Sequence, residues 1–316
     1  MKQINKYALK RKSTKIALSL MRTVFFVGIG FYILYPIFTK FMMAFMAEGD
    51  LYDATVSLVP KNWTMDNIKL VFEAMEFPEA FKNSVILSVM VMVLQLASAL
   101  LVGYGFGRFD FPFKNILFVL GIFMLVVPPS TMILPLYLTY SNFDILGIFK
   151  LTTGDSLNLL NTYYPFILSS FFCTGTKGMM FVFMFRQFFR NMPREIEEAA
   201  CVDGAGEFRT FWQVMMPSSK PIIVCVSLLS FVWQWTDILY TGWYMSGAKL
   251  LSVNLYALTE NVKVFIATGG SVVIGPAYQA LLNGTGSIMV ILPLLILYIF
   301  MQRSFIQSVE RSGIVG

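Results

Sequence analysis

Residues 193–217 read PREIEEAACVDGAGEFRTFWQVMMP, a charged stretch that separates two long apolar runs. Its first half predicts a short helix, because Pro193 suits the first helical turn and the glutamates behind it favour the positive end of a helix. Gly204 can adopt the left-handed backbone conformation that ends a helix. We therefore expect a short amphipathic helix that ends in a glycine elbow.

The second half of this stretch carries bulky apolar side chains at helical spacing. They are Phe208, Phe211, Trp212 and Met215. Pro217 is expected to end the second helix. We call residues 193–217 the bracket and predict that it docks against another protein. The alternative is an ordinary surface helix in which Arg194 and Glu198 pair one turn apart.

Composition indicates that lipid surrounds most of this chain. Of its 316 residues, 57% are hydrophobic and 13% are charged, and the mean hydropathy is +0.68. Soluble domains contain about 25% charged residues, roughly twice this fraction. The net charge of +6 would suit a nucleic-acid-binding protein, but the basic residues gather at the N-terminus and in a few loops. We therefore expect one integral membrane domain and no nucleic-acid partner.

Basic residues crowd the N-terminus directly before the first apolar run. By the positive-inside rule, they place this end of the chain in the cytoplasm. A cleaved signal peptide also has a basic head and an apolar middle. The run from Thr23 to Phe38 is long for such a middle, and no small-x-small cleavage site follows before Glu48. A retained membrane span is the interpretation that we prefer.

Six apolar runs are long enough to cross a bilayer. They lie near 20–46, 84–107, 115–139, 163–189, 219–243 and 284–303. The loop after the first run is acidic, as the positive-inside rule expects of an outer loop. Basic residues flank the short turn after the second run (Arg108, Lys114) and lie in and around the bracket (Arg186, Arg190, Arg194, Arg209, Lys220), which places both on the inner side. We predict an all-α membrane protein with six transmembrane helices, both termini in the cytoplasm, and a cytoplasmic loop between spans four and five.

Two of the expected spans contain residues that change helix packing. Span two carries Ala99, Gly103 and Gly107 at four-residue steps, a pattern that lets membrane helices pack closely. Span three contains Pro128 and Pro129, which remove backbone donors and predict a kink. The kink suits either a bend in a pore lining or a purely structural role.

Span five ends in FVWQWTDILY, residues 231–240. Gln234 and Asp237 are costly within a bilayer, and such groups usually face the protein interior or a water-filled cavity. Beside Trp235 they would suit a sugar, which offers ring faces for stacking and hydroxyls for hydrogen bonds. These three residues are candidates for a substrate path. The alternatives are an aromatic belt at the membrane surface and helix packing.

The residues of metal and nucleotide sites are scarce in this sequence. There is no histidine, and Cys173, Cys201 and Cys225 lack the spacing of metal ligands or of a disulfide framework. No stretch fits the GxxxxGK[ST] phosphate-binding motif, and no acid pair or nucleophile–base set stands out. We expect a protein that is not an enzyme and that holds neither a metal nor a cofactor.

The bracket resembles the EAA signature of ABC importer membrane subunits. Glu198-Ala199-Ala200 is followed by Gly204 at the spacing of that motif. In the family, the motif forms a coupling helix that seats in a cleft of a cytoplasmic ATPase. The resemblance implies that the glutamate makes a charge contact there, that the alanines allow a close fit, and that the glycine supplies the bend. It assigns ATPase coupling to Glu198, Ala199, Ala200, Asp203, Gly204, Phe208 and Pro217.

Other segments resemble the carbohydrate branch of these importers, the family of the maltose-type second permease. Gly103–Phe109 resembles the end of that family's second span, with glycines in place of alanines. Ile133–Tyr137 resembles the IPLY sequence in that family's third span. Gly313 and Gly316 resemble a Gly-rich tail that reaches the ATPase pair, although the usual lysine before the last glycine is absent. We divide the chain into a basic cytoplasmic segment (1–19), a first transmembrane helix (20–46), an extracytoplasmic loop (47–82), an importer core (83–304, with its coupling loop at 190–218) and a cytoplasmic tail (305–316).

The resemblance implies a permease subunit that forms half of the translocation path for a sugar or oligosaccharide. Its expected partners in the bacterial cytoplasmic membrane are a second permease subunit, two ATPases that bind ATP and magnesium, an extracytoplasmic solute-binding protein, the sugar, and membrane lipid. The alternative cargo is a non-sugar solute such as glycerol phosphate. The rival classes are an ion-driven carrier that uses Asp237, and a membrane-embedded enzyme. The sequence shows neither inverted repeats nor a catalytic constellation for them.

Overall fold

The computed structural model describes residues 2–175, 177–266 and 274–313. Helices supply the regular structure of these residues, and no strand occurs among them. Helices suit a bilayer because each one satisfies its backbone hydrogen bonds within its own segment. The prediction of an all-α chain is therefore confirmed for this part of the sequence.

The chain divides into two compact units, and one helix contributes to both. Unit 1 comprises Met1–Ala74 with Leu258–Met289, and unit 2 comprises Met75–Ala257 with Val290–Gly316. Helix α16, Pro276–Gly313, begins in unit 1 and ends in unit 2. The other helices of unit 1 are α1 (Lys2–Ala44), the 3-10 helix η1 (Glu48–Tyr52), α2 (Asp66–Ala74) and α15 (Leu258–Ile266).

Buried polar contacts hold the loop of unit 1 that follows α1. The side chain of Asn67 on α2 donates to the carbonyl of Met46 at 2.7 Å. The buried carboxylate of Asp50 accepts the backbone N–H groups of Lys61 at 2.8 Å and Asn62 at 2.7 Å. Hydrogen bonds of this kind satisfy backbone groups beyond a helix end. The segment that we expect outside the membrane therefore has a defined local fold.

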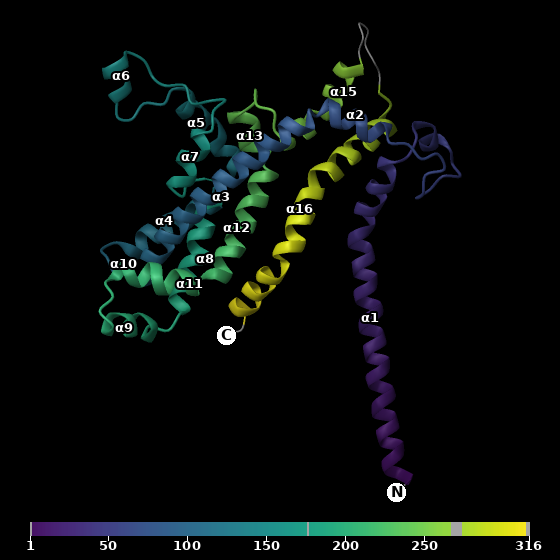
Figure 1. Cartoon of the computed structure of the whole chain (residues 1–316), viewed down its shortest axis with the longest axis horizontal. Coiled ribbons are helices and arrows are strands. Elements are labelled where there is room, and N and C mark those ends of the chain that lie inside the picture. The colour runs from purple at the N-terminus through teal and green to yellow at the C-terminus, as the bar shows by residue number, and fades with distance from the viewer. Residues whose placement is uncertain (1, 176, 267–273, 314–316) are drawn as a thin grey trace. The chain divides into compact units, whose positions relative to one another are not determined.

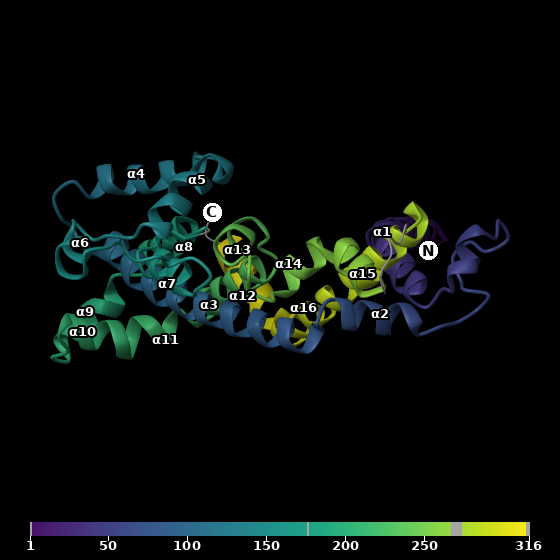
Figure 2. The same ribbon diagram turned by 90° about the horizontal axis from the view of Figure 1, so that it is seen from above.

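Unit 2 is built around α3, the helix from Phe77 to Arg108, and α8 and α12 pack along it (Figures 1 and 2). At about 1.5 Å per residue its 32 residues span about 48 Å, which exceeds the roughly 30 Å of a hydrocarbon core. The remaining helical elements of unit 2 before the bracket are α4 (Lys114–Val126), α5 (Pro129–Ser141), α6 (Ile148–Thr153), α7 (Tyr164–Phe171) and α8 (Gly178–Asn191). The bracket and the segment behind it contain α9 (Glu195–Val202), α10 (Glu207–Thr210), the π-helix η2 (Phe211–Met215), α11 (Met216–Ser218), α12 (Lys220–Trp235), α13 (Leu239–Tyr244) and α14 (Leu251–Tyr256).

Three of the expected spans are broken helices rather than continuous ones. Helices α4 and α5 meet at a bend of 102°, with Pro128 and Pro129 at the break. Proline donates no backbone hydrogen bond, and the residue before it disfavours the helical conformation. The expected span 163–189 is likewise divided into α7 and α8, and the span 219–243 into α12 and α13.

Several helices are long and apolar enough to cross a membrane. Thr14–Ala44, Phe77–Arg108 and Pro276–Arg303 meet this condition singly. The number rises from 3 to 5 if each of two bent pairs, α4 with α5 and the α10–α11 segment with α12, is one span. Three to five apolar spans are therefore present in the described part of the chain.

Helices α3 and α8 approach closely because glycines face the phenylalanines of α8. A Cβ added to Gly103 would lie 2.4 Å from the Cβ of Phe185, and one added to Gly107 would lie 3.0 Å from the Cβ of Phe189. Ala99 is fully buried in the same core. Small residues permit such an approach between membrane helices. This seam supports the bracket, which begins directly after α8.

Candidate functional site

The bracket lies in unit 2, at the end of α8 (Figures 1 and 2). Its first helix, α9, begins after Arg194, and three glutamates occupy the first turn. Gly204 follows the helix with a φ of +79°. Because an L side chain is strained in this conformation, glycine suits the elbow. The predicted short helix and the glycine elbow at its end are therefore present in the structure.

The second half of the bracket winds differently from the α-helix that we expected. Helix α10 runs into the π-helical turn η2, and α11 then carries the helical path through Pro217 instead of ending before it. Proline has no N–H to donate, and its ring crowds the carbonyl four residues back. The wider π-turn accommodates it, with Met216 N–H donating to the Phe211 carbonyl.

One face of the bracket is anchored in the core of unit 2. Phe211 and Met215 are buried in the same hydrophobic cluster as Phe185 and Phe189 of α8, and the ring of Phe211 packs against that of Tyr104. Ala200 of α9 is also buried. Phe208 and Trp212 instead point away and pack edge to face with each other. The apolar pattern of the sequence therefore splits into an inward pair and an outward pair.

Glu197 fastens the bracket to α3, a role that we did not derive from the sequence. Its Oε1 accepts the hydroxyl of Tyr104 at 3.1 Å and lies 3.4 Å from Nε of Arg108. The guanidinium of Arg108 also donates to the carbonyl of Met192 at 2.9 Å. Glu197 and Tyr104 are 93 positions apart, so no local spacing rule connects them. Removal of one member would leave a largely buried charge without its partner.

The outward face of the bracket combines carboxylates with exposed apolar groups. Val202 is 87% exposed and Phe208 is 77% exposed. Of the residues to which the resemblance assigns coupling, the buried one is Ala200, and the exposed ones are Glu198, Ala199, Asp203, Gly204, Phe208 and Pro217. The described residues show no ion pair between Arg194 and Glu198, so the simple surface pair is not formed here. Exposed apolar groups beside charges are typical of a surface that docks another protein.

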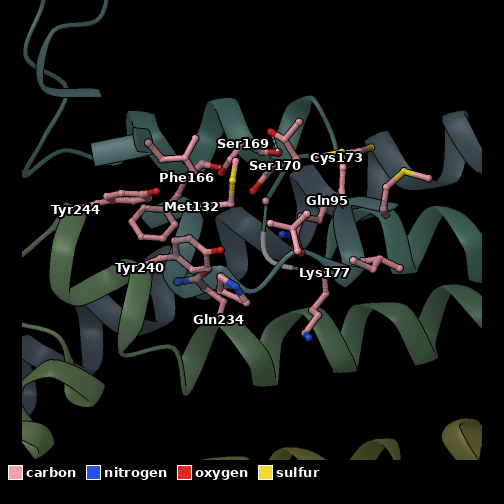
Figure 3. Close-up of a pocket in the computed structure, with 18 of the residues that line it drawn as sticks. Gln95, Met132, Phe166, Ser169, Ser170, Cys173, Lys177, Gln234, Tyr240 and Tyr244 are labelled. Carbon is pink, nitrogen blue, oxygen red and sulfur yellow. Dashed lines mark hydrogen bonds between the residues drawn. The ribbon is translucent and has the colours of Figure 1, made fainter. Parts of the chain in front are cut away.

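A cavity of about 420 Å³ forms a second site within unit 2 (Figure 3). Gln234 of α12 and Tyr240 and Tyr244 of α13 lie on one side, and Ser169 and Ser170 of α7 lie on the other. The Nε2 atom of Gln234 and the hydroxyl of Tyr244 are buried without a hydrogen-bond partner. Buried polar groups are costly unless they are satisfied. This lining can therefore offer hydrogen bonds to a polar solute.

The residues proposed for a substrate path are separated by the structure. Gln234 lines the cavity, whereas Trp235 and Asp237 do not. The indole Nε1 of Trp235 donates to the carbonyl of Val290 at 3.1 Å, which ties α12 to α16. Asp237 accepts the backbone N–H of Thr241 at 2.7 Å and also its hydroxyl, so this carboxylate caps α13. Their direct role is to hold helices together.

Other cavity residues were not among our candidates. Gln95 reaches the cavity from α3 and accepts the hydroxyl of Ser230 at 2.7 Å. Lys177 also lines it, 5.9 Å from the ring centre of Trp233. An amide in the middle of an apolar span was a usable signal for Gln95. No such signal exists for Lys177, because the break between α7 and α8 decides its position.

The described residues hold no group of three or more His, Cys, Asp or Glu side chains that could bind a metal ion. Cys173 and Cys225 are buried and Cys201 is exposed, and no disulfide joins cysteines among the described residues. Gly313 is the last residue of α16, and Gly316 lies outside the described residues.

Relatives of known sequence match nearly the whole chain. It is 30% identical to the arabinooligosaccharides transport system permease protein AraQ of Halalkalibacterium halodurans, over 98% of this chain and 100% of that protein. It is 26% identical to the diacetylchitobiose uptake system permease protein NgcG of Streptomyces coelicolor, over 88% of this chain and 83% of that protein. Both proteins are named as permeases of uptake or transport systems.

A solved structure and a family match agree with these relatives. A bacterial ABC transporter involved in alginate import superposes with a TM-score of 0.65 at 18% identity, over 91% of this chain and 96% of that one. At this identity the likeness establishes the fold alone. Residues 99–311, which include the bracket and most of the cavity lining, match the family described as the inner membrane component of binding-protein-dependent transport systems. The chain therefore belongs to this family of membrane transport components.

Proposed function

We propose that this chain is a permease subunit of an ABC importer that carries a sugar or oligosaccharide across the bacterial cytoplasmic membrane. Its family membership supports the transport role, and the names of AraQ and NgcG support a carbohydrate cargo. A second permease subunit completes the translocation path, and a solute-binding protein delivers the cargo. Two ATPases bind ATP and magnesium and drive the cycle, so this chain itself catalyses no reaction.

The observation that carries the proposal is the two-sided surface of the bracket. Its inner side is fixed by Phe211, Met215 and the Glu197–Arg108 contact. Its outer side presents Glu198 and Phe208 to solvent. A rigid, charged and partly apolar projection is suited to seat in a cleft of another protein. We assign this outer side to the ATPase contact, with Glu198 facing a basic residue of the ATPase.

The packing of the bracket also suggests how force reaches the membrane helices. The bracket joins α8 at one end and α12 at the other, and both helices pack along α3. A displacement of the outer side is therefore transmitted to a packed helix group rather than absorbed by a loose loop. We propose that closure of the ATPases moves the bracket as a rigid body and thereby switches the path between its outward and inward openings.

We assign the 420 Å³ cavity to the translocation path. Its volume lies within the range of about 300–1,000 Å³ that is usual for small-molecule sites. Gln234 and Tyr244 offer unsatisfied polar atoms, and Tyr240 offers a ring face. Trp235 and Asp237 then support the lining indirectly, through α16 and α13. Such a combination fits the apolar faces and hydroxyl edges of a sugar.

The proposed topology has six crossings with both termini in the cytoplasm. The clustering of basic residues at the N-terminus and around the bracket supports this orientation. In this arrangement the loop of unit 1 behind α1 faces the solute-binding protein, and the tail behind Gly313 forms a second contact with the ATPases.

Cys201 offers a direct test of the ATPase contact, because it is the exposed native cysteine on α9 while Cys173 and Cys225 are buried. We would attach a photoreactive benzophenone maleimide to Cys201 in the assembled transporter and identify the cross-linked chain by mass spectrometry. The expected product joins this chain to the ATPase, and it disappears in the Cys201→Ser control. An intact, active complex in which the probe reaches only lipid or water would refute the assignment.

Uptake measurements test the coupling role and the cargo. The complete transporter in proteoliposomes should take up arabino-oligosaccharides or related sugars in an ATP-dependent manner, and glycerol 3-phosphate serves as the non-sugar comparison. Glu198→Lys should abolish sugar uptake without loss of membrane insertion, because it inverts the charge on the docking face. Glu73→Lys provides the matched control, since this exposed glutamate lies in unit 1. Normal coupled uptake by Glu198→Lys would contradict the proposal.

A further inference from the structure

A second cavity, of about 650 Å³, opens where α3, α4 and α8 end or begin. It is separate from the outer side of the bracket and from the cavity of Figure 3. Asp110 is the acidic residue of its lining. The basic residues of the lining are Arg108, Lys114, Arg186, Arg190 and Arg194. We call this cavity the arginine recess.

Two of the five cations already have counter-charges within the protein. Arg108 pairs with Glu197 at 3.4 Å, as described for the bracket. Lys114 pairs with Asp110 at 3.1 Å and also donates to a backbone carbonyl. The recess therefore retains the positive charge of its other three members.

Arg186, Arg190 and Arg194 have no carboxylate partner in the part of the chain that the structure describes. The guanidinium carbon of Arg186 lies 3.9 Å from the ring centre of Phe118, a cation–π contact. Its Nε atom is buried and has no hydrogen-bond acceptor. A buried cationic donor without an acceptor is costly, and an anion in the recess would remove this cost. The geometry thus calls for a negatively charged ligand.

The chemistry of the donors favours a phosphate group. Guanidinium groups form paired hydrogen bonds with phosphate oxygens, and several of them together bind phosphate more selectively than a single ammonium group does. Three unpaired arginines supply both charge and donors. A zwitterionic headgroup would add its own positive charge to a recess that is already positively charged. A ligand with net negative charge is therefore favoured.

The surroundings of the recess favour a lipid as the source of the phosphate. Phe113, at its mouth, is 72% exposed, and along α4 Ile116 is 58% and Leu120 is 59% exposed. This apolar surface belongs to a helix pair that is apolar enough to cross a membrane. A phospholipid can place its acyl chains on such a surface and its phosphate at the end, where basic residues meet the headgroup region.

We propose that the arginine recess binds the phosphate of an anionic phospholipid. The bound headgroup bridges α8, through Arg186 and Arg190, to Arg194 at the start of the bracket. It thereby stabilises the junction from which the bracket projects. This inference does not depend on the cargo or on the ATPase contact.

The test measures lipid binding by the purified protein in the absence of substrate and ATP. Native mass spectrometry would count dioleoyl phosphatidylglycerol molecules retained on the protein as the lipid is titrated, and the thermal midpoint would be followed in parallel. We expect Arg190→Gln to weaken the tightest binding by about tenfold, the loss of one charge-assisted contact. Arg209→Gln is the matched control, since it removes an equal charge from a side chain that bonds Gln213 outside the recess, and its affinity should stay within about twofold.

Arg186→Lys is a second, conservative variant. It keeps the positive charge but removes the paired N–H donors of the guanidinium group. It should weaken binding while the protein remains folded, which the thermal midpoint in detergent alone would verify. Equal affinity of wild type, Arg190→Gln and Arg186→Lys for phosphatidylglycerol would overturn the proposal. So would an equal stabilisation by phosphatidylcholine, or by inorganic phosphate at the same concentration. Protection of the three arginines from arginine-specific modification by the ATPase alone, without lipid, would assign the recess to a protein partner instead.

Discussion

The substitution Gly103→Ala tests the close packing of α3 and α8 on which the position of the bracket depends. The added Cβ would lie 2.4 Å from the Cβ of Phe185 and 3.1 Å from backbone atoms of Val182 and Arg186. Carbon atoms normally approach to about 3.5–4.0 Å, so the two helices must separate by about 1 Å. Overpacking of this kind costs about 1–3 kcal/mol. At about 2–4 °C per kcal/mol for a large domain, the apparent Tm should fall by about 2–12 °C.

Two neighbouring glycines provide a graded control for this effect. Gly107→Ala places its Cβ 3.0 Å from Phe189 and should cost less, whereas Gly105→Ala meets nothing within 4 Å and should cost nothing. The three variants would be purified in one detergent, heated in steps and analysed by fluorescence-detected size-exclusion chromatography. The expected order of stability is Gly105→Ala, then Gly107→Ala, then Gly103→Ala. A Gly103→Ala protein as stable as the Gly105→Ala protein would refute the close seam.

Three further experiments probe other parts of the molecule. Gly204→Ala should cost about 1–2 kcal/mol through left-handed backbone strain and reduce coupled uptake, whereas Gly206→Ala, whose φ is −70°, should not change either measurement. Trp235→Phe removes the bond to Val290 and should lower stability by about 1 kcal/mol in thermal denaturation; an unchanged midpoint would argue against this tie. Hydrogen bonds from Thr55 lower the pKa of Asp53 from 3.8 to about 2, so this carboxylate stabilises the loop fully above about pH 4, and the contribution is lost as the pH falls toward about 2. A difference infrared titration against Asp53→Asn should show protonation near pH 2, and protonation near pH 4 would contradict the contact.

Local sequence pattern determines most of the helices and the plan of the bracket. Glu195, Gly204 and the apolar residues behind them are enough to indicate two short helices with an elbow, because caps, charges at a helix start and glycine conformation are local effects. The glycine spacing at Gly103 and Gly107 likewise indicates a packed face. These features depend on neighbours within one or two helical turns, so they can be predicted from the local sequence.

The path of a helix at a proline depends on more than the local sequence. Pro128 and Pro129 predict a break in the third span. The size of the bend between α4 and α5, 102°, depends on what packs against each of these helices. Pro217 reads as a stop, whereas a π-turn lets the helix pass through it. Proline fixes only its own φ and a missing donor. Whether a helix ends, bends or widens there depends on tertiary contacts.

Composition and local pattern are enough to predict an apolar, helical chain that carries a short charged helix and a glycine elbow between two apolar runs. Tertiary structure alone decided that Glu197, not Glu198, is held by Tyr104 and Arg108, and that Gln234 lines a cavity while Asp237 caps a helix. The reason is physical. Helical periodicity tells which residues share a face, but the partner of that face comes from distant parts of the chain, and only packing brings them together.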